Sequence, residues 1–186
     1  MVNKELKNAL TRKMKIKIDT IRRASKELIG NIIRTPTIRS QHLSSEINGE
    51  VFLKLENLQY TSSFKVRGAY TSITRLKEDQ KKVGVIAMSA GNHAQAVAWW
   101  AKKERVNATI VMPEHAPLFK VMKTKSLGAD VILRGRTLNE SQTYVSELAN
   151  DKKLTLIHPY DDSNVVIGQG TLGLEFMADI KDLDLL

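Results

Sequence analysis

The sequence has no cysteine and no long apolar run, and these two absences remove several classes of protein. Without cysteine, neither disulfides nor thiolate metal sites can contribute to the fold. The apolar stretches are short, such as residues 165–167 (VVI), so no segment is expected to span a bilayer. The lysine-rich start is not followed by an apolar segment with a small-residue cleavage site, which favours a cytoplasmic protein.

Aromatic residues are also scarce, whereas basic charge is plentiful near the N-terminus. The formal net charge is +9, and much of it lies in residues 1–26. A basic helix can follow a nucleic-acid backbone or lie on a membrane surface. With aromatic residues at only 5% and no aromatic RNA-binding motif, the pattern favours a solvated helix face. A basic nucleic-acid-binding module is kept as an alternative.

The apolar pattern predicts strands that alternate with helices. A helix is expected over residues 18–28, before Gly30, and a short strand over 51–56. Alternating strands and helices of this length favour an α/β fold with a mainly parallel sheet, which binds ligands beyond the C-terminal ends of its strands. The further strands are expected at 83–88, 108–112, 129–133 and 154–157, and the helices at 94–102, 118–127, 138–149 and 171–180.

The loop after the strand at 83–88 has the composition of an anion-binding turn. Residues 89–93 (SAGNH) join a strand end to a helix start. Glycine lets the backbone approach a ligand, and the first N–H groups of the helix are free to bind an anion. A tight turn with Asn92 as the helix cap is the structural alternative.

Lys65 is flanked by the apolar residues Phe64 and Val66, which is unusual for a solvated surface. Desolvation would lower the pKa of this lysine and make its neutral amine available for a Schiff base. Taken alone, any lysine in so basic a chain is more often a surface residue. Phe64 by itself could equally be a core residue of a strand.

Together, the segments 63–69 (SFKVRGA) and 89–93 (SAGNH) resemble the serine/threonine dehydratase family, which depends on pyridoxal phosphate and has fold type II (tryptophan synthase β-like). The resemblance runs from about residue 18 to the C-terminus and includes segments 34–36 (RTP), 158–162 (HPYDD) and 168–171 (GQGT).

The resemblance implies a role for each residue of the two segments. Lys65 would form the Schiff base with pyridoxal 5′-phosphate, Asn92 would hydrogen-bond the cofactor, and Phe64 would pack beside it. Ala90 stands where related serine racemases look to have a serine, so the resemblance favours elimination over racemisation. The expected cofactor residues are Phe64, Lys65 and Asn92, and the expected carboxylate residues are Ser89, Ala90, Gly91, Asn92 and His93.

The resemblance also implies a domain organisation. Residues 1–17 would be a basic extension, 18–53 the N-terminal part of a large domain, and 54–150 a complete small α/β domain. Residues 151–186 would begin the returning part of the large domain. In the family a glycine-rich loop that holds the cofactor phosphate follows, so the large domain is expected to be incomplete and the chain truncated.

Two further patterns look like binding sites. Gly168, Gly170 and Gly173 match a dinucleotide-binding fingerprint, but the second strand that this fingerprint needs is missing, and the resemblance explains the glycines better. The histidines His42, His93, His115 and His158 show no metal-ligand spacing, so no metal is expected. His158, followed by Asp161 and Asp162, reads as a capped turn.

The resemblance implies an ammonia-lyase that converts L-threonine or serine to a 2-oxo acid and ammonia by β-elimination. With L-threonine the product would be 2-oxobutyrate, in threonine catabolism or isoleucine biosynthesis. Two alternatives stay open: an inert truncated remnant, and one half of a split enzyme completed by a C-terminal fragment. A homo-oligomer stays open beside the complementing fragment, and nucleic acid is not the favoured partner.

Overall fold

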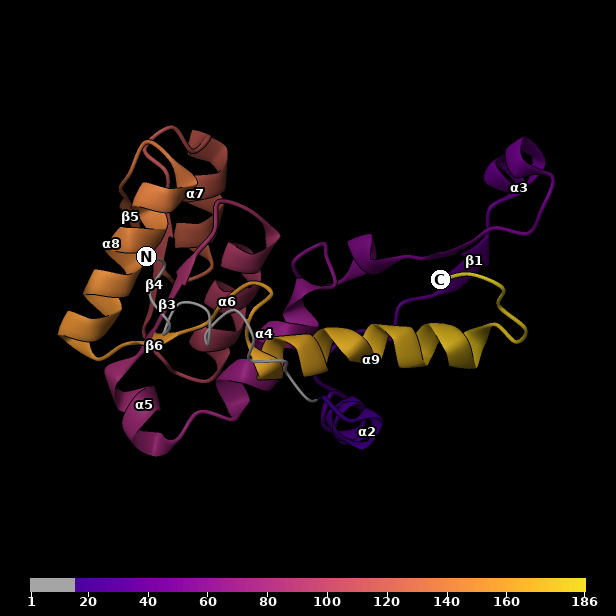
Figure 1. Cartoon of the computed structure of the whole chain (residues 1–186), viewed down its shortest axis with the longest axis horizontal. Helices are drawn as coiled ribbons and strands as arrows, with labels where there is room; N and C mark the ends of the chain where they lie inside the picture. Colours follow the sequence, from indigo (N-terminus) through magenta and orange to yellow (C-terminus); the bar gives the residue numbers. More distant parts are fainter. Residues whose placement is uncertain (1–15) are drawn as a thin grey trace, which may run out of the picture.

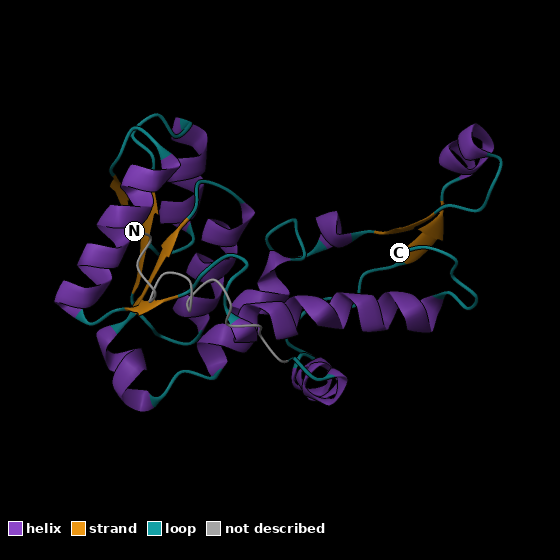
Figure 2. Ribbon diagram, viewed as in Figure 1, coloured by secondary structure: helices purple, strands orange, loops and turns teal. Residues whose placement is uncertain are grey.

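The computed structural model describes residues 16–186, and it has two differently built parts (Figure 1). One is a sheet with helices on both faces. The other is an extended part in which a long helix runs alongside a two-stranded arm (Figure 2). Most of the predicted basic extension, residues 1–15, lies outside the described residues. No helix in residues 16–186 is long and apolar enough to cross a membrane.

The main sheet has four parallel strands in the order β5-β4-β3-β6. Side chains alternate along β3 and β4, so the sheet has two apolar faces. Val85, Ala87 and Ile110 pack with α4 and α6, whereas Ile86 and Val111 pack with α8. The bounds are β3 (Val85–Met88), α6 (Asn92–Lys103), β4 (Ala108–Met112), α7 (Leu118–Ser126), β5 (Asp130–Leu133), α8 (Leu138–Lys152) and β6 (Thr155–Leu156).

The extended part is organised around the last helix. Two short strands, β1 and β2, pair antiparallel to form the arm, which carries α3 at its far end (Figure 1). The long helix α9 packs against α4 and α2. The bounds are α2 (Ile18–Glu27), β1 (Thr37–Arg39), α3 (Gln41–Ile47), β2 (Phe52–Lys54), η1 (Glu56–Leu58), α4 (Lys65–Thr74), α5 (Glu78–Val83) and α9 (Ser163–Asp179).

The predicted α/β fold with a parallel sheet is confirmed, but several element bounds were wrong. Val83 ends helix α5, and Gly84, with φ of +108°, turns the chain before β3 starts at Val85. Helix α9 begins at Ser163 and not at residue 171, because Asp162 caps it by accepting hydrogen bonds from the next N–H groups. The run VVI is therefore a turn of helix. Helices α3, α4 and α5 were not predicted.

The start of α9 also removes the dinucleotide fingerprint, which requires its glycines at a strand-to-helix turn. All three glycines lie inside α9. Gly168 packs on α4, where an added Cβ would meet the backbone oxygen of Arg67 and would lie 2.7 Å from the Cα of Gly68. An added Cβ at Gly68 would in turn lie 2.8 Å from the backbone oxygen of Val165. Glycine is used here for close approach of two helices.

Candidate active site

Three chain segments meet where the predicted site residues lie. Lys65 is the first residue of α4, the loop 89–91 follows β3, and the loop 157–162 follows β6. Because β3 and β6 are parallel neighbours, their C-terminal ends share one edge of the sheet. The Lys65 Nζ donates a hydrogen bond of 2.9 Å to the backbone oxygen of Pro159, so α4 is joined to this edge.

The Lys65 amine lies in a partly buried position. Burial lowers the pKa of Lys65 from its ordinary value of 10.5. The Phe64 ring lies beside it, with Nζ 5.3 Å from the ring centroid. Phe64 stands at the N-cap position of α4 and is 38% exposed, so the alternative of a core strand residue was wrong. Val66, on the other side of Lys65, is fully buried.

The loop 89–93 is built differently from a side-chain-capped turn. Helix α6 begins at Asn92 with Gly91 at the N-cap and no side-chain capping bond, so the alternative of Asn92 as the cap was wrong. The Asn92 side chain is exposed. Ser89 Oγ accepts a 3.1 Å hydrogen bond from the Gly91 N–H. An added Cβ at Gly91 would meet nothing within 4 Å, so packing within the described residues does not demand glycine there.

His93 is the most enclosed residue of this loop, with 3% of its surface exposed. Its Nε2 lies 2.9 Å from the backbone oxygen of Ile157, at the end of β6. Burial is the main reason that its pKa falls to about 4. The Ile157 hydrogen bond acts in the opposite direction, whereas Lys65 and His158 lower the pKa further. His93 therefore stays neutral at neutral pH and ties two loops of the site together.

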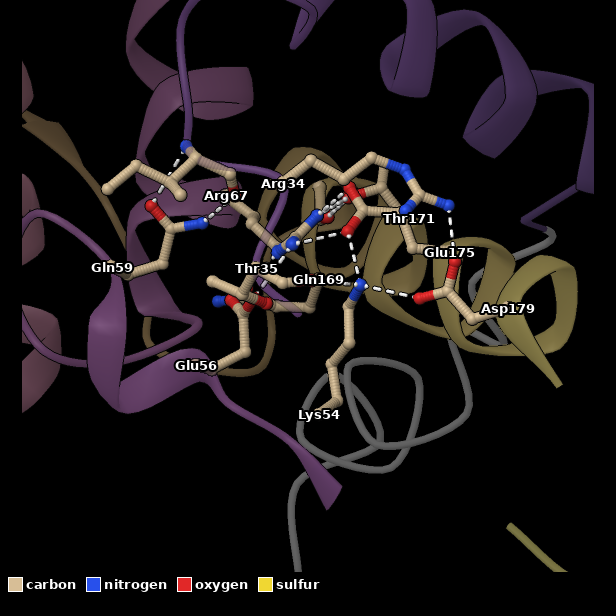
Figure 3. Close-up of polar contacts among 12 residues, drawn as sticks. Arg34, Thr35, Lys54, Glu56, Gln59, Arg67, Gln169, Thr171, Glu175 and Asp179 are labelled. Atoms are coloured by element: carbon tan, nitrogen blue, oxygen red, sulfur yellow. Dashed lines mark hydrogen bonds and ion pairs between the residues drawn. The ribbon is translucent and has the colours of Figure 1, made fainter. Parts of the chain in front are cut away.

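Sequence reasoning missed a polar network centred on Arg67, which stands two residues after Lys65 in α4 (Figure 3). Arg67 is fully buried and donates to Glu56 at 2.8 Å and 2.9 Å and to Glu175 at 2.7 Å and 2.9 Å. Lys54 joins Glu175 to Asp179, each pair at 3.0 Å. We call Lys54, Glu56, Arg67, Glu175 and Asp179 the polar network. Arg67 within SFKVRGA was the signal that could have found it.

The segment 158–162 forms a turn held by its own polar groups. His158 Nδ1 accepts hydrogen bonds from the backbone N–H groups of Tyr160 and Asp161, at 3.3 Å and 2.8 Å. Asp162 caps α9 and also accepts a 3.1 Å hydrogen bond from the Ser72 hydroxyl. Within residues 16–186, no three histidine or carboxylate side chains gather in a way that could hold a metal ion.

These groups fit pyridoxal phosphate and an amino-acid substrate. A partly buried amine with a lowered pKa can bond to the aldehyde carbon of the cofactor. The first backbone N–H groups of α6 have no acceptor within the helix and suit a carboxylate. Gly91 precedes these N–H groups, and the space beside its Cα holds no other atom of the described residues within 4 Å of an added Cβ.

Comparison with known proteins identifies the family. Residues 28–186 match the family model described as "Pyridoxal-phosphate dependent enzyme". The chain is 54% identical over 154 residues to a catabolic L-threonine dehydratase of Staphylococcus aureus (strain USA300), covering 82% of this chain and 44% of that protein. The chain therefore spans less than half the length of this curated relative.

Solved structures agree in fold. Threonine deaminase isoform 2 from Solanum lycopersicum superposes with a TM-score of 0.81 at 35% identity, covering 90% of this chain and 48% of that one. Serine racemase from Dictyostelium discoideum gives a TM-score of 0.83, also at 35% identity, covering 91% and 55%. By sequence and by fold, the chain belongs to the family of pyridoxal-phosphate-dependent enzymes.

Proposed function

We propose that this chain carries the amine and the carboxylate loop of a threonine or serine ammonia-lyase. The observation that supports this most is the position of the Lys65 amine. It is partly buried, its pKa is lowered by burial, and its Nζ is held by the Pro159 carbonyl at the sheet edge from which loop 89–93 begins. The 54% identity to a catabolic L-threonine dehydratase supports threonine as the substrate.

The proposed chemistry uses Lys65 as the base. Pyridoxal phosphate, when bound, would delocalise the electron pair that remains when the α-proton leaves. The neutral Lys65 amine would accept that proton, which requires a pKa below the ordinary lysine value. The proton held by Lys65 would then pass to the departing β-hydroxyl group, which leaves as water. Addition of water to the remaining imine would give 2-oxobutyrate and ammonia from L-threonine.

The other site residues would bind and orient. Backbone N–H groups in the loop formed by Ser89, Ala90, Gly91, Asn92 and His93 would hold the substrate carboxylate, which fixes the α-carbon relative to Lys65. The exposed Asn92 amide would donate to the cofactor ring oxygen, and the partly exposed Phe64 ring would pack beside the ring.

Ala90 favours elimination over racemisation. Its methyl group has no proton to exchange with the second face of the substrate. The distinction matters because serine racemases are among the similar structures. Ala90→Ser is expected to introduce measurable interconversion of L- and D-serine in a holoenzyme that eliminates. If wild type already racemises serine as fast as it deaminates threonine, Ala90 does not set the reaction.

The first test is covalent labelling of the full chain. The chain is incubated with pyridoxal phosphate, reduced with borohydride and mapped by mass spectrometry. We expect one pyridoxyl-lysine, at Lys65, which disappears in Lys65→Ala and persists in Lys123→Ala, an exposed control on α7. Label scattered over many lysines contradicts the proposal. If Lys65 is labelled but L-threonine gives no 2-oxobutyrate, cofactor binding stands and lyase activity of this chain fails.

The partners form a separate proposal. A second copy of the chain or a complementing C-terminal fragment would supply contacts to the cofactor phosphate. Size-exclusion chromatography with light scattering, with and without pyridoxal phosphate, shows whether two copies of the chain associate. Covalent labelling of Lys65 after addition of the matching C-terminal part of a threonine dehydratase shows whether a fragment completes the site. A cytoplasmic location stays a prediction.

A further inference from the structure

The loop after β6 contacts both halves of the proposed site within three residues. The backbone oxygen of Ile157 lies 2.9 Å from His93 Nε2, and the backbone oxygen of Pro159 accepts a 2.9 Å hydrogen bond from Lys65 Nζ. His93 lies in the carboxylate loop and Lys65 begins α4, so two side chains from distant segments bind neighbouring carbonyls of one loop.

The contact fixes the tautomer of His93. A carbonyl oxygen can only accept, so Nε2 must carry the proton and Nδ1 carries a lone pair in the neutral ring. The titratable groups that act on the imidazole are Lys65 on α4 and His158 and Asp162 on the loop. The ring is 3% exposed, so no exposed face is left through which water could readily replace the contact.

The His93 hydrogen bond fixes the orientation of the peptide group after Ile157, which the hydrogen bonds of the sheet leave free. The Ile157 N–H donates to the Ile86 oxygen of β3 at 2.8 Å, which fixes the peptide before Ile157. The peptide after Ile157 is oriented by its carbonyl, and His93 holds that carbonyl. At the other end, Asp162 caps α9 and accepts from Ser72. The Pro159 carbonyl lies between these two anchors.

We propose that His93 is a positioning residue for Lys65, acting through the Ile157–Pro159 segment to keep the Lys65 amine on the Pro159 carbonyl. The inference rests on the proposed function of Lys65 as the reacting amine. Without the His93 contact the segment would turn away, Lys65 would gain water, and its pKa would return toward the ordinary lysine value of 10.5.

The test measures the Lys65 amine without cofactor. The full chain is acetylated with trace acetic anhydride across a pH series, and the label on each lysine is counted by mass spectrometry. The midpoint of the profile reports the pKa of that lysine, whereas its plateau reports access. His93→Leu removes the donor and keeps an apolar side chain of similar size. His93→Gln keeps an N–H that can reach the Ile157 carbonyl, and His115→Leu changes an exposed histidine as the matched control.

We expect His93→Leu to move the Lys65 midpoint upward and to reduce its labelling severalfold at pH 8, with the exposed Lys123 unchanged. His93→Gln should restore the wild-type midpoint, and His115→Leu should not move it. An unchanged midpoint in His93→Leu overturns the proposal. An equal shift in both His93 variants also overturns it, since packing and not the hydrogen bond would then be the cause.

A measurement on the wild-type chain keeps the proposal testable if the variants do not fold. Long-range ¹H–¹⁵N spectra should show His93 as the Nε2–H tautomer and untitrated near its ordinary pKa of 6.5. Titration of His93 near 6.5, or the opposite tautomer, overturns the inference. Because cofactor is absent throughout, these results are independent of whether pyridoxal phosphate labels Lys65.

Discussion

Helix α4 is held on two sides by opposite kinds of interaction. On one side Val66, Ala69 and Ile73 are fully buried in the apolar core that covers β3 and β4. On the other side Arg67, equally buried, lies among the carboxylates of the polar network. An apolar core tolerates changes of shape at moderate cost, whereas a buried charge requires all of its partners. Lys65 is the first residue of α4, so the apolar core and the polar network together fix its position.

The largest expected effect comes from breaking the polar side. Arg67→Met leaves the Glu56 and Glu175 carboxylates without their main partner and should lower the free energy of unfolding by about 3–5 kcal/mol. In the apolar core, Ile110→Val should cost only about 0.5–1.5 kcal/mol. Urea unfolding followed by circular dichroism measures both.

Arg75→Met is the charge-matched control, at the C-terminal end of the same helix. Arg75 pairs with Glu27 at 2.9 Å, but both side chains are partly exposed, so its loss should cost less than about 1 kcal/mol. If Arg67→Met costs no more than Arg75→Met, the contrast between the two sides of α4 is wrong.

The two sides also differ in how far the sequence predicts them. Strand β4 was predicted with its observed bounds because a β-branched run is stopped by Pro113. Lys65 and loop 89–93 were predicted from a motif, and the structure brings them to one sheet edge. Helix α4 was missed because its buried positions include Arg67 and Thr71, which break the apolar period.

The long-range polar contacts had no local signal at all. Arg67 reaches Glu175 across more than 100 positions of sequence. His93 binds the backbone oxygen of Ile157. Every residue type has this oxygen, so the sequence at position 157 could not have predicted the contact. Sequence patterns indicate which residues are buried and whether a segment is a helix or a strand. Which side chains pair across the fold depends on the three-dimensional structure.

The next largest effect is a pH dependence of stability that is due to His93, which joins loop 89–93 to loop 157–162. In the folded chain the pKa of His93 is lowered from its ordinary value of 6.5 to about 4, mainly because the imidazole is buried. The unfolded chain therefore binds the proton first, and the stability due to neutral His93 is complete above pH 6.5 and is lost as pH falls toward 4. The loss should be on the order of 3 kcal/mol.

His93→Gln should remove most of this slope, while His115→Gln should keep it. The measurement is urea unfolding at several pH values between 4 and 7.5. A wild-type stability that is flat over this interval would contradict a buried neutral His93.

A smaller effect is expected where α9 packs on α4. Gly168→Ala places a methyl group against the backbone of Arg67 and Gly68, which should cost about 1–3 kcal/mol. Gly173→Ala, in the same helix, meets nothing within 4 Å and should stabilise by about 0.5–1 kcal/mol, because alanine favours a helix over glycine. Thermal unfolding of the two variants gives opposite shifts, and equal shifts would refute the close helix contact.

The smallest effect is expected at the edge of the polar network, where Asp179 ties the arm to α9. Its carboxylate accepts from Thr37, Lys54 and Arg34. Burial alone would raise its pKa, but the hydrogen bonds and positive charges outweigh burial and hold the pKa below 3.8. Its contribution is therefore complete above pH 3.8 and is lost as pH falls through the lower folded value.

Asp179→Asn should cost about 1 kcal/mol or less at pH 7, because Arg34 is largely exposed and the buried Lys54 keeps Glu175 as its ion-pair partner. The difference from wild type should shrink below pH 3.8, where the wild-type carboxylate is protonated too. Hydrogen exchange of the β1 and β2 amides locates the effect. Faster exchange confined to the arm means that the network tethers it locally, whereas equal acceleration in β3 and β4 means that the two sides of the molecule unfold as one unit.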